Sequence, residues 1–177
     1  MLIYVKVKGE SQTKKTSFLE KFSNGERNYM MTNTPERLTA NAMTELPLLR
    51  QFVPHQQLLG VLTAEGEESG FAETKLLDLA NLVRAMPKTY EQDGLGQEAI
   101  AYLHYFGGSA DFYITEKDME REQLQAFGAA SYGGGLGLEL GYISLADLCA
   151  HPLMELDFHY KPQTLREIYA AREAQER

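Results

Sequence analysis

The feature that most constrains the fold of this chain is a series of β-rich segments separated by glycine turns. Residues 100–106 are apolar and aromatic, Gly107, Gly108 and Ser109 follow, and residues 112–115 return to a β-type composition. Glycine adopts the positive φ that a tight reversal needs at little steric cost. Two β-rich runs on either side of such a turn predict a β-hairpin.

A second hairpin is predicted directly after the first. Residues 124–132 form another β-rich run, glycines occupy positions 133–135, and residues 138–143 supply an antiparallel partner. A phosphate-binding loop is the alternative for these glycines, but it needs a following Lys-Ser/Thr pair. Leu138 and Glu139 follow instead, and a glutamate repels phosphate, so a hairpin turn is favoured.

Short elements are predicted after the second hairpin. The Ser144 hydroxyl is placed to accept a hydrogen bond from the amide of Asp147, which predicts a short capped helix that ends at His151 and Pro152. Residues 154–160 then alternate between apolar and polar side chains, which predicts a strand with one buried and one wet face.

Two longer helices complete the predicted fold. Residues 72–86 carry apolar side chains at helical spacing and are followed by Pro87. Thr164 and Glu167 form a capping box at the start of a helix over residues 164–175. We therefore expect an α+β fold, with a mainly antiparallel sheet packed by the helix 72–86 and the C-terminal helix 164–175.

The first part of the chain is less regular. It is predicted to contain a strand, a helix that breaks near Pro47, and a second strand, at residues 2–7, 35–44 and 58–63 respectively. Residues 64–70 are acidic and contain glycine, so they form the candidate boundary between an N-terminal region, residues 1–70, and an α+β domain, residues 71–177. The N-terminal region is either separate or part of the same domain.

The charge of the chain is negative and unevenly distributed. The net charge is −8, and residues 1–27 carry six basic and three acidic residues, so residues 28–177 carry eleven basic and 22 acidic ones. Such an acidic body disfavours direct contact with nucleic acid and favours a basic or DNA-binding protein partner. Solubility alone is the simpler explanation of the charge.

Composition limits the environment in which the chain works. A hydrophobic content of 44% can build a core. No apolar run reaches the ~20 residues that span a bilayer, so no membrane partner is expected. Because no signal-peptide pattern is present and the single Cys149 has no internal disulfide partner, we expect a cytoplasmic protein.

The candidate binding residues are four alternating carboxylates, Glu116, Asp118, Glu120 and Glu122. In an extended chain these side chains would point the same way and form an acidic edge towards a basic partner. A solvated loop is the alternative, and a calcium loop of the helix–loop–helix type lacks its required glycine.

Catalytic and metal sites are less well supported. Cys149 with His104, His151 or His159 could form a small hydrolase or metal enzyme, but the spacing matches no closed metal site and no local catalytic signature. Buried packing suits Cys149, a partnered sheet position suits His104, and a wet position suits His159. We expect no cofactor and no metal.

Nucleic-acid binding by the basic N-terminal segment is a further alternative. This segment carries six cationic residues, Lys6, Lys8, Lys14, Lys15, Lys21 and Arg27. Clustered cations of this kind are what phosphate binding requires.

Several segments in the second half of the chain match a known pattern in order and spacing. They are residues 86–90, 101–106, 112–116, 139–145 and 156–162. In these segments the chain resembles, over about residues 75–168, an uncharacterised bacterial family known only as a domain of unknown function. That family usually has tryptophan in the strand at residues 111–116, whereas this chain contains none.

The resemblance implies a genomic setting rather than a reaction. The family is carried largely on plasmids, phages and conjugative elements, and it offers no catalytic residues to transfer to this chain. It implies a non-enzymatic accessory protein of a mobile element. Together with the charge, it leads us to expect an inhibitor or nucleic-acid mimic that acts on a DNA-binding host-defence protein.

Overall fold

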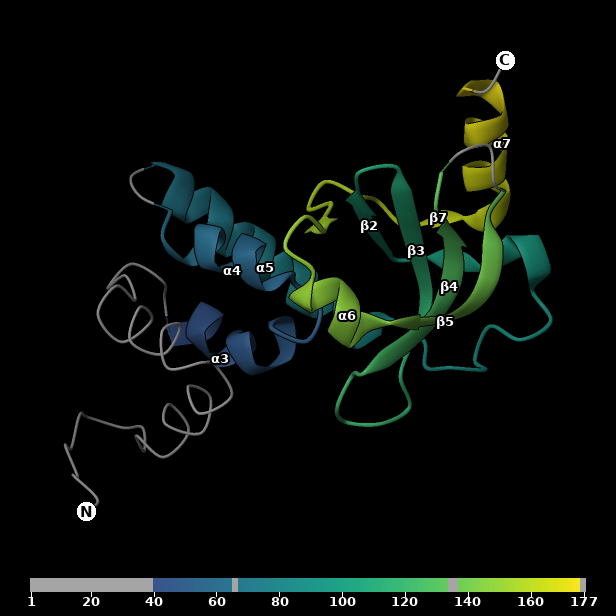
Figure 1. The fold of residues 1–177 in the computed structure, drawn as a ribbon. Helices are drawn as coiled ribbons and strands as arrows, with labels where there is room; N and C mark the ends of the chain where they lie inside the picture. Colours follow the sequence, from purple (N-terminus) through teal and green to yellow (C-terminus); the bar gives the residue numbers. More distant parts are fainter. Residues whose placement is uncertain (1–39, 65–66, 134–136, 176–177) are drawn as a thin grey trace. The chain divides into compact units, whose positions relative to one another are not determined.

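The computed structural model describes residues 40–64, 67–133 and 137–175 of the chain, and all of them belong to one compact unit, Leu38–Arg177 (Figure 1). The predicted strand 2–7, the first part of the predicted helix 35–44 and the basic segment lie outside the described residues. Among the described helices, none is long and apolar enough to cross a membrane.

The fold is α+β, as predicted, and is built on a five-stranded antiparallel sheet with the order β5-β4-β3-β2-β6. Its strands are β2 (Leu103–Gly107), β3 (Ala110–Lys117), β4 (Gln125–Ser131), β5 (Glu139–Ser144) and β6 (Glu155–Leu156). Both predicted hairpins, β2–β3 and β4–β5, are confirmed.

Two glycines are needed by this sheet for different reasons. Gly108, in the β2–β3 turn, has a φ of +60°, where a side chain would strain the backbone. Gly128 on β4 lies so close to β3 that a Cβ there would come within 2.1 Å of the Tyr113 carbonyl oxygen. The register of β3 on β4 shifts between Ile114 and Glu116, which marks a bulge at this close approach.

One face of the sheet packs on helices α3 (Ala40–Leu49), α4 (His55–Leu62) and α5 (Glu67–Ala85). Tyr105 on β2 is fully buried there, and its hydroxyl donates to the Phe52 carbonyl oxygen at 2.6 Å. The predicted helix 72–86 is therefore confirmed as α5, which begins five residues earlier. The core on this face includes Phe52, Leu58, Leu76, Ile114 and Leu156.

Two predictions for this helical layer are wrong. The helix expected to break near Pro47 continues through it to Leu49, because Leu46 and Leu49 are both buried in the core and packing outweighs the lost backbone donor. The strand expected at residues 58–63 lies in helix α4. Leu58 and Leu62, one helical turn apart, are its buried residues.

The other face of the sheet carries helix α7 (Leu165–Gln175) and a small ladder of β1 (Ile100–Ala101) with β7 (Gln163–Thr164). Leu165 and Ile168 of α7 pack with Ala101 and Ala129. The Glu167 carboxylate accepts from the Thr164 backbone N–H at 2.8 Å, and the Glu167 backbone N–H donates to the Thr164 hydroxyl. This confirms the C-terminal helix and its capping box.

The short elements are also as predicted, with one difference. Helix α6 (Leu145–Ala150) begins at Ser144, whose hydroxyl accepts from the Asp147 N–H at 3.1 Å. The strand expected over residues 154–160 is limited to β6. A turn follows it, in which the Tyr160 N–H donates to the Asp157 carbonyl oxygen.

Candidate functional site

The loop that joins α5 to β1 has an unusual backbone. We refer to residues 87–98 as the tyrosine loop. Among the described residues that are not glycine, Tyr90 is the one with a positive φ, +77°, and 61% of its surface is exposed. A non-glycine residue in this region costs about 1–3 kcal/mol and persists only where its surroundings determine the conformation.

The side chain of Glu116 holds Tyr90 in this backbone conformation. It lies on β3, is 3% exposed, and its carboxylate accepts hydrogen bonds from the backbone N–H groups of Tyr90 (3.1 Å) and Gln92. A buried carboxylate is costly unless such donors compensate it. Glu116 is therefore both the anchor of the loop and a charge that needs the loop in place.

Gln92 fixes the middle of the tyrosine loop to the strands beneath. Its side-chain oxygen accepts from the Ile100 N–H at 2.8 Å, and its amide nitrogen donates to the carbonyl oxygens of Ile100 and Thr115, each at 2.9 Å. All the hydrogen-bonding groups of this side chain thus face the protein. The loop is rigidly attached even though most of its residues are exposed.

Lys117 fixes the start of the loop. Its ammonium donates to the carbonyl oxygens of Val83 (2.7 Å) and Arg84 (2.8 Å) at the end of α5, where the helix dipole favours a cation. Partial burial lowers the pKa of this lysine. Its backbone also pairs with the loop, because its N–H donates to Pro87 and its carbonyl accepts from Thr89.

The exposed end of the loop meets β5. The hydroxyls of Tyr90 and Tyr142 lie 2.9 Å apart, and Tyr142 is 54% exposed. This hydrogen bond raises the pKa of Tyr142, and the charges of Glu116 and Asp93 raise it further. Leu140, two residues earlier on the same face of β5, is 52% exposed.

These residues form an exposed surface with both aromatic and acidic character. We call Tyr90, Glu91, Asp93, Leu140 and Tyr142 the tyrosine surface. Glu91 and Asp93 are exposed, and the Glu91 carboxylate accepts a hydrogen bond from the Lys88 backbone N–H at 2.7 Å. The arrangement presents aromatic rings next to negative charge, which suits a cationic ligand.

The four carboxylates predicted to bind a partner do not share one environment in the structure. β3 ends at Lys117, so the later residues do not continue the alternation of a strand. Glu116 and Asp118 are buried, 3% and 7% exposed, and the Asp118 carboxylate accepts from the Glu120 N–H at 3.1 Å. Glu120 and Glu122 are exposed. Their role in binding stays a prediction.

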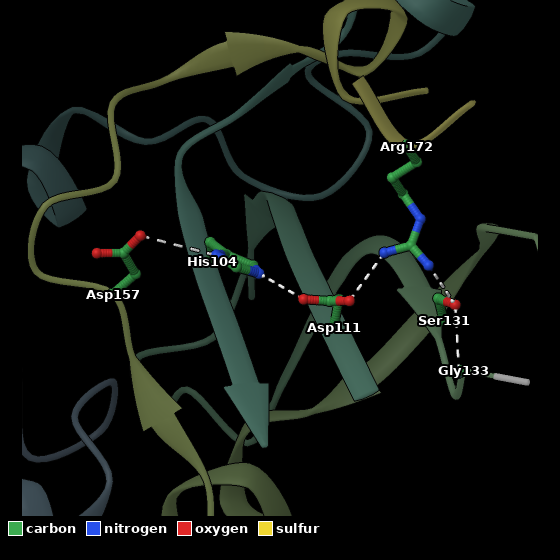
Figure 2. Close-up of polar contacts among 6 residues, drawn as sticks. All are labelled: His104, Asp111, Ser131, Gly133, Asp157 and Arg172. Carbon is green, nitrogen blue, oxygen red and sulfur yellow. Dashed lines mark hydrogen bonds and ion pairs between the residues drawn. The ribbon is translucent and has the colours of Figure 1, made fainter. Parts of the chain in front are cut away.

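A second polar cluster crosses the face of the sheet under α7 (Figure 2). His104 Nε2 lies 2.9 Å from Asp111 Oδ1, and its Nδ1 lies 3.8 Å from Asp157 Oδ2. Arg172 of α7 donates to Asp111 Oδ2 at 2.8 Å and to the Ser131 hydroxyl at 2.9 Å. Figure 2 shows this chain of contacts running from Asp157 to Ser131.

This chain of contacts is directed inwards. The His104 ring stacks on Tyr113 with centroids 4.5 Å apart, and its side chain is 16% exposed. The hydrogen bond to Asp111 raises the pKa of Arg172. The guanidinium charge of Arg172 is therefore paired within the protein. Ser131 is only 1% exposed. The cluster therefore fastens α7 and the Asp157 turn to the sheet, and His104 is the partnered sheet histidine that was predicted.

Cys149 and the remaining histidines lie in different environments. Cys149 is 3% exposed on α6, its thiol lies 3.6 Å from the Gln51 carbonyl oxygen, and burial raises its pKa to about 12. His151 and His159 are exposed, the latter as predicted. Within the described ranges, no three His, Cys, Asp or Glu side chains are grouped as a metal site requires.

Comparison of the chain with protein-family models, with curated proteins and with solved structures finds no match. The positive φ of Tyr90 has no local signal in the sequence. The bonds to Glu116 join residues 24 and 26 positions apart.

Proposed function

We propose that the protein is a non-enzymatic interaction module that binds a basic protein through the tyrosine surface. The observation that carries this proposal is the exposed Tyr90 in a strained conformation, held there by the buried Glu116. Backbone strain of this kind concentrates at functional sites, because elsewhere it would only lower stability. A rigid aromatic side chain on a loop is also a common binding anchor.

Charge supports a cationic partner. Residues 28–177 contain twice as many acidic as basic residues, 22 against eleven. A lysine or arginine over the ring of Tyr90 or Tyr142 would gain about 0.5–1 kcal/mol from the cation–π contact. Asp93 and Glu91 add attraction of the same sign, and the overall negative field speeds the approach of a basic partner.

The family resemblance suggests the class of protein to which the partner belongs. We propose a DNA-binding protein of a host defence system, met in the cytoplasm, whose basic groove is occupied by this acidic accessory protein of a mobile element. In this role the carboxylates take the place of phosphates. The exposed Glu120 and Glu122 would extend the negative surface beyond the tyrosine surface.

Capture from a host lysate tests this function. The full chain is immobilised, and bound proteins are compared between about 0.05 M and about 0.5 M salt, where the screening length falls from above 10 Å to well below it. We expect basic proteins that are released by salt. Asp93→Asn should weaken their retention more than Asp147→Asn, an exposed aspartate on α6. Partners indifferent to both salt and Asp93 would reject the proposal.

A further inference from the structure

The two edges of the five-stranded sheet are not alike. β6 forms one edge, has two residues, and is followed at once by the Asp157 turn. β5 forms the other edge, has six residues, and pairs only with β4 among the described strands. Short edges resist pairing with other chains, whereas long ones allow it.

Of the features that protect an edge, β5 carries a charged residue, Glu139, at its start. Its sequence, Glu-Leu-Gly-Tyr-Ile-Ser, contains no proline and no lysine, and its pairing with β4 is regular over six residues. A Cβ at Gly141 would meet no atom within 4 Å, so the face of the sheet is open at the centre of this strand. An edge strand directs alternate N–H and C=O groups away from its partner, and these can bond a further strand.

From this geometry we infer that β5 receives an extended segment of the partner as an additional β-strand. The inference rests on the proposed function and specifies how the tyrosine surface is used. Main-chain hydrogen bonds along β5 would supply affinity, and side chains that alternate between the two faces would supply specificity.

The side chains on the two faces of β5 predict the sequence of the segment that would pair with it. On one face the added strand would lie beside Leu140 and Tyr142, which favours apolar side chains. On the other face it would lie beside the exposed Glu139, which favours lysine or arginine, and beside Gly141 and the buried Ile143. The segment is therefore expected to alternate apolar and basic residues. A second copy of this chain is a poorer occupant, since it brings the same acidic surface.

A model peptide tests the inference directly. The probe is a capped heptapeptide of alternating lysine and valine, titrated into the full chain while backbone amide exchange is followed. We expect slower exchange at residues 139–144. A peptide of equal charge with proline at the central position should bind about tenfold more weakly, since it cannot complete the ladder.

A variant of the protein tests the location. Leu140→Lys places a charge on the edge and leaves Tyr90 and Tyr142 in place, and we expect it to weaken the lysine–valine peptide about tenfold. Leu153→Lys, at a leucine that is 73% exposed and outside the sheet, makes the same change of charge and should leave binding unchanged.

The outcomes separate this inference from the proposed function. Equal binding of both peptides, or equal effects of both lysine variants, would overturn the added strand while leaving salt-dependent capture intact. No binding of the peptide would also overturn it, and the capture experiment would then decide the function independently. Protection of residues 139–144 that rises with protein concentration alone would show a second copy on β5 and contradict the inference.

Discussion

Glu116 is a residue for which the environment predicted from the sequence is the opposite of the one in the structure. As part of an alternating acidic run it is a candidate for an exposed edge, yet it lies buried and binds the N–H groups of Tyr90 and Gln92. Its partners come from the loop before β1, so the contact depends on the tertiary fold. A local pattern of charge cannot reveal such a contact.

Replacing Glu116 tests its role as an anchor. In Glu116→Gln one acceptor oxygen remains and an amide donor faces backbone N–H groups, which leaves buried donors without partners. We expect a loss of about 1–3 kcal/mol in the free energy of unfolding, measured by urea denaturation. Glu120→Gln, at an exposed glutamate, should change this free energy by less than about 0.5 kcal/mol. Equal effects of both variants would contradict the anchoring role.

Cys149 should be an unreactive thiol in the folded protein. Burial raises its pKa to about 12, so at pH 8 the nucleophilic thiolate is scarce and also shielded. We expect a disulfide reagent to react with the native protein far more slowly than with the protein in urea. A fast reaction of the folded chain would restore the possibility of a catalytic cysteine.

At the scale of elements, glycine and capping patterns were sufficient to predict both hairpins, α6 and α7, because their determinants lie within a few residues. For residues 58–63 the sequence predicts a strand, because so short an apolar run does not let periodicity separate helix from strand. Its helical state depends on distant packing. Gln57, for example, bonds both the N–H and the carbonyl of Leu156.

The attachment of α7 to the sheet depends on Arg172. Arg172→Gln removes a half-buried charge pair with Asp111, and we expect a loss of about 1 kcal/mol in the free energy of unfolding. Arg166→Gln breaks the more exposed contact of the same helix with Glu98, and should lower the free energy of unfolding by less. A double-mutant cycle with Asp111→Asn measures the coupling, and zero coupling would show that the contact does not stabilise α7.

The capping box of α7 makes the helix sensitive to acid. Hydrogen bonds from Thr164 lower the pKa of Glu167 below the ordinary value of a glutamate. A carboxyl with a lowered pKa stabilises the folded state above its unfolded pKa, and this stabilisation is lost as the pH falls through the folded pKa. Amide exchange in α7 should therefore be faster in Glu167→Gln than in the parent at pH 7, with a smaller difference at pH 3. Glu173→Gln, elsewhere on α7, should not show this pattern.

At the scale of the molecule, the structure joins an acidic body to a rigid aromatic surface beside a long open sheet edge. The charge could be seen in the sequence, because it needs no knowledge of the fold. The surface could not, since it depends on Tyr90 and Tyr142, which are 52 positions apart and meet through their hydroxyls. The proposed binding of a basic partner would account for all three features.

The most direct test of this account is Tyr90→Gly, measured for both folding and binding. Glycine accepts a φ of +77° without strain, so we expect the free energy of unfolding to stay equal or to rise by up to about 1 kcal/mol. Affinity for the captured basic partner should fall about tenfold, whereas Tyr132→Ala, at a tyrosine that is 68% exposed outside the tyrosine surface, should bind normally. Unchanged affinity of Tyr90→Gly would contradict the account.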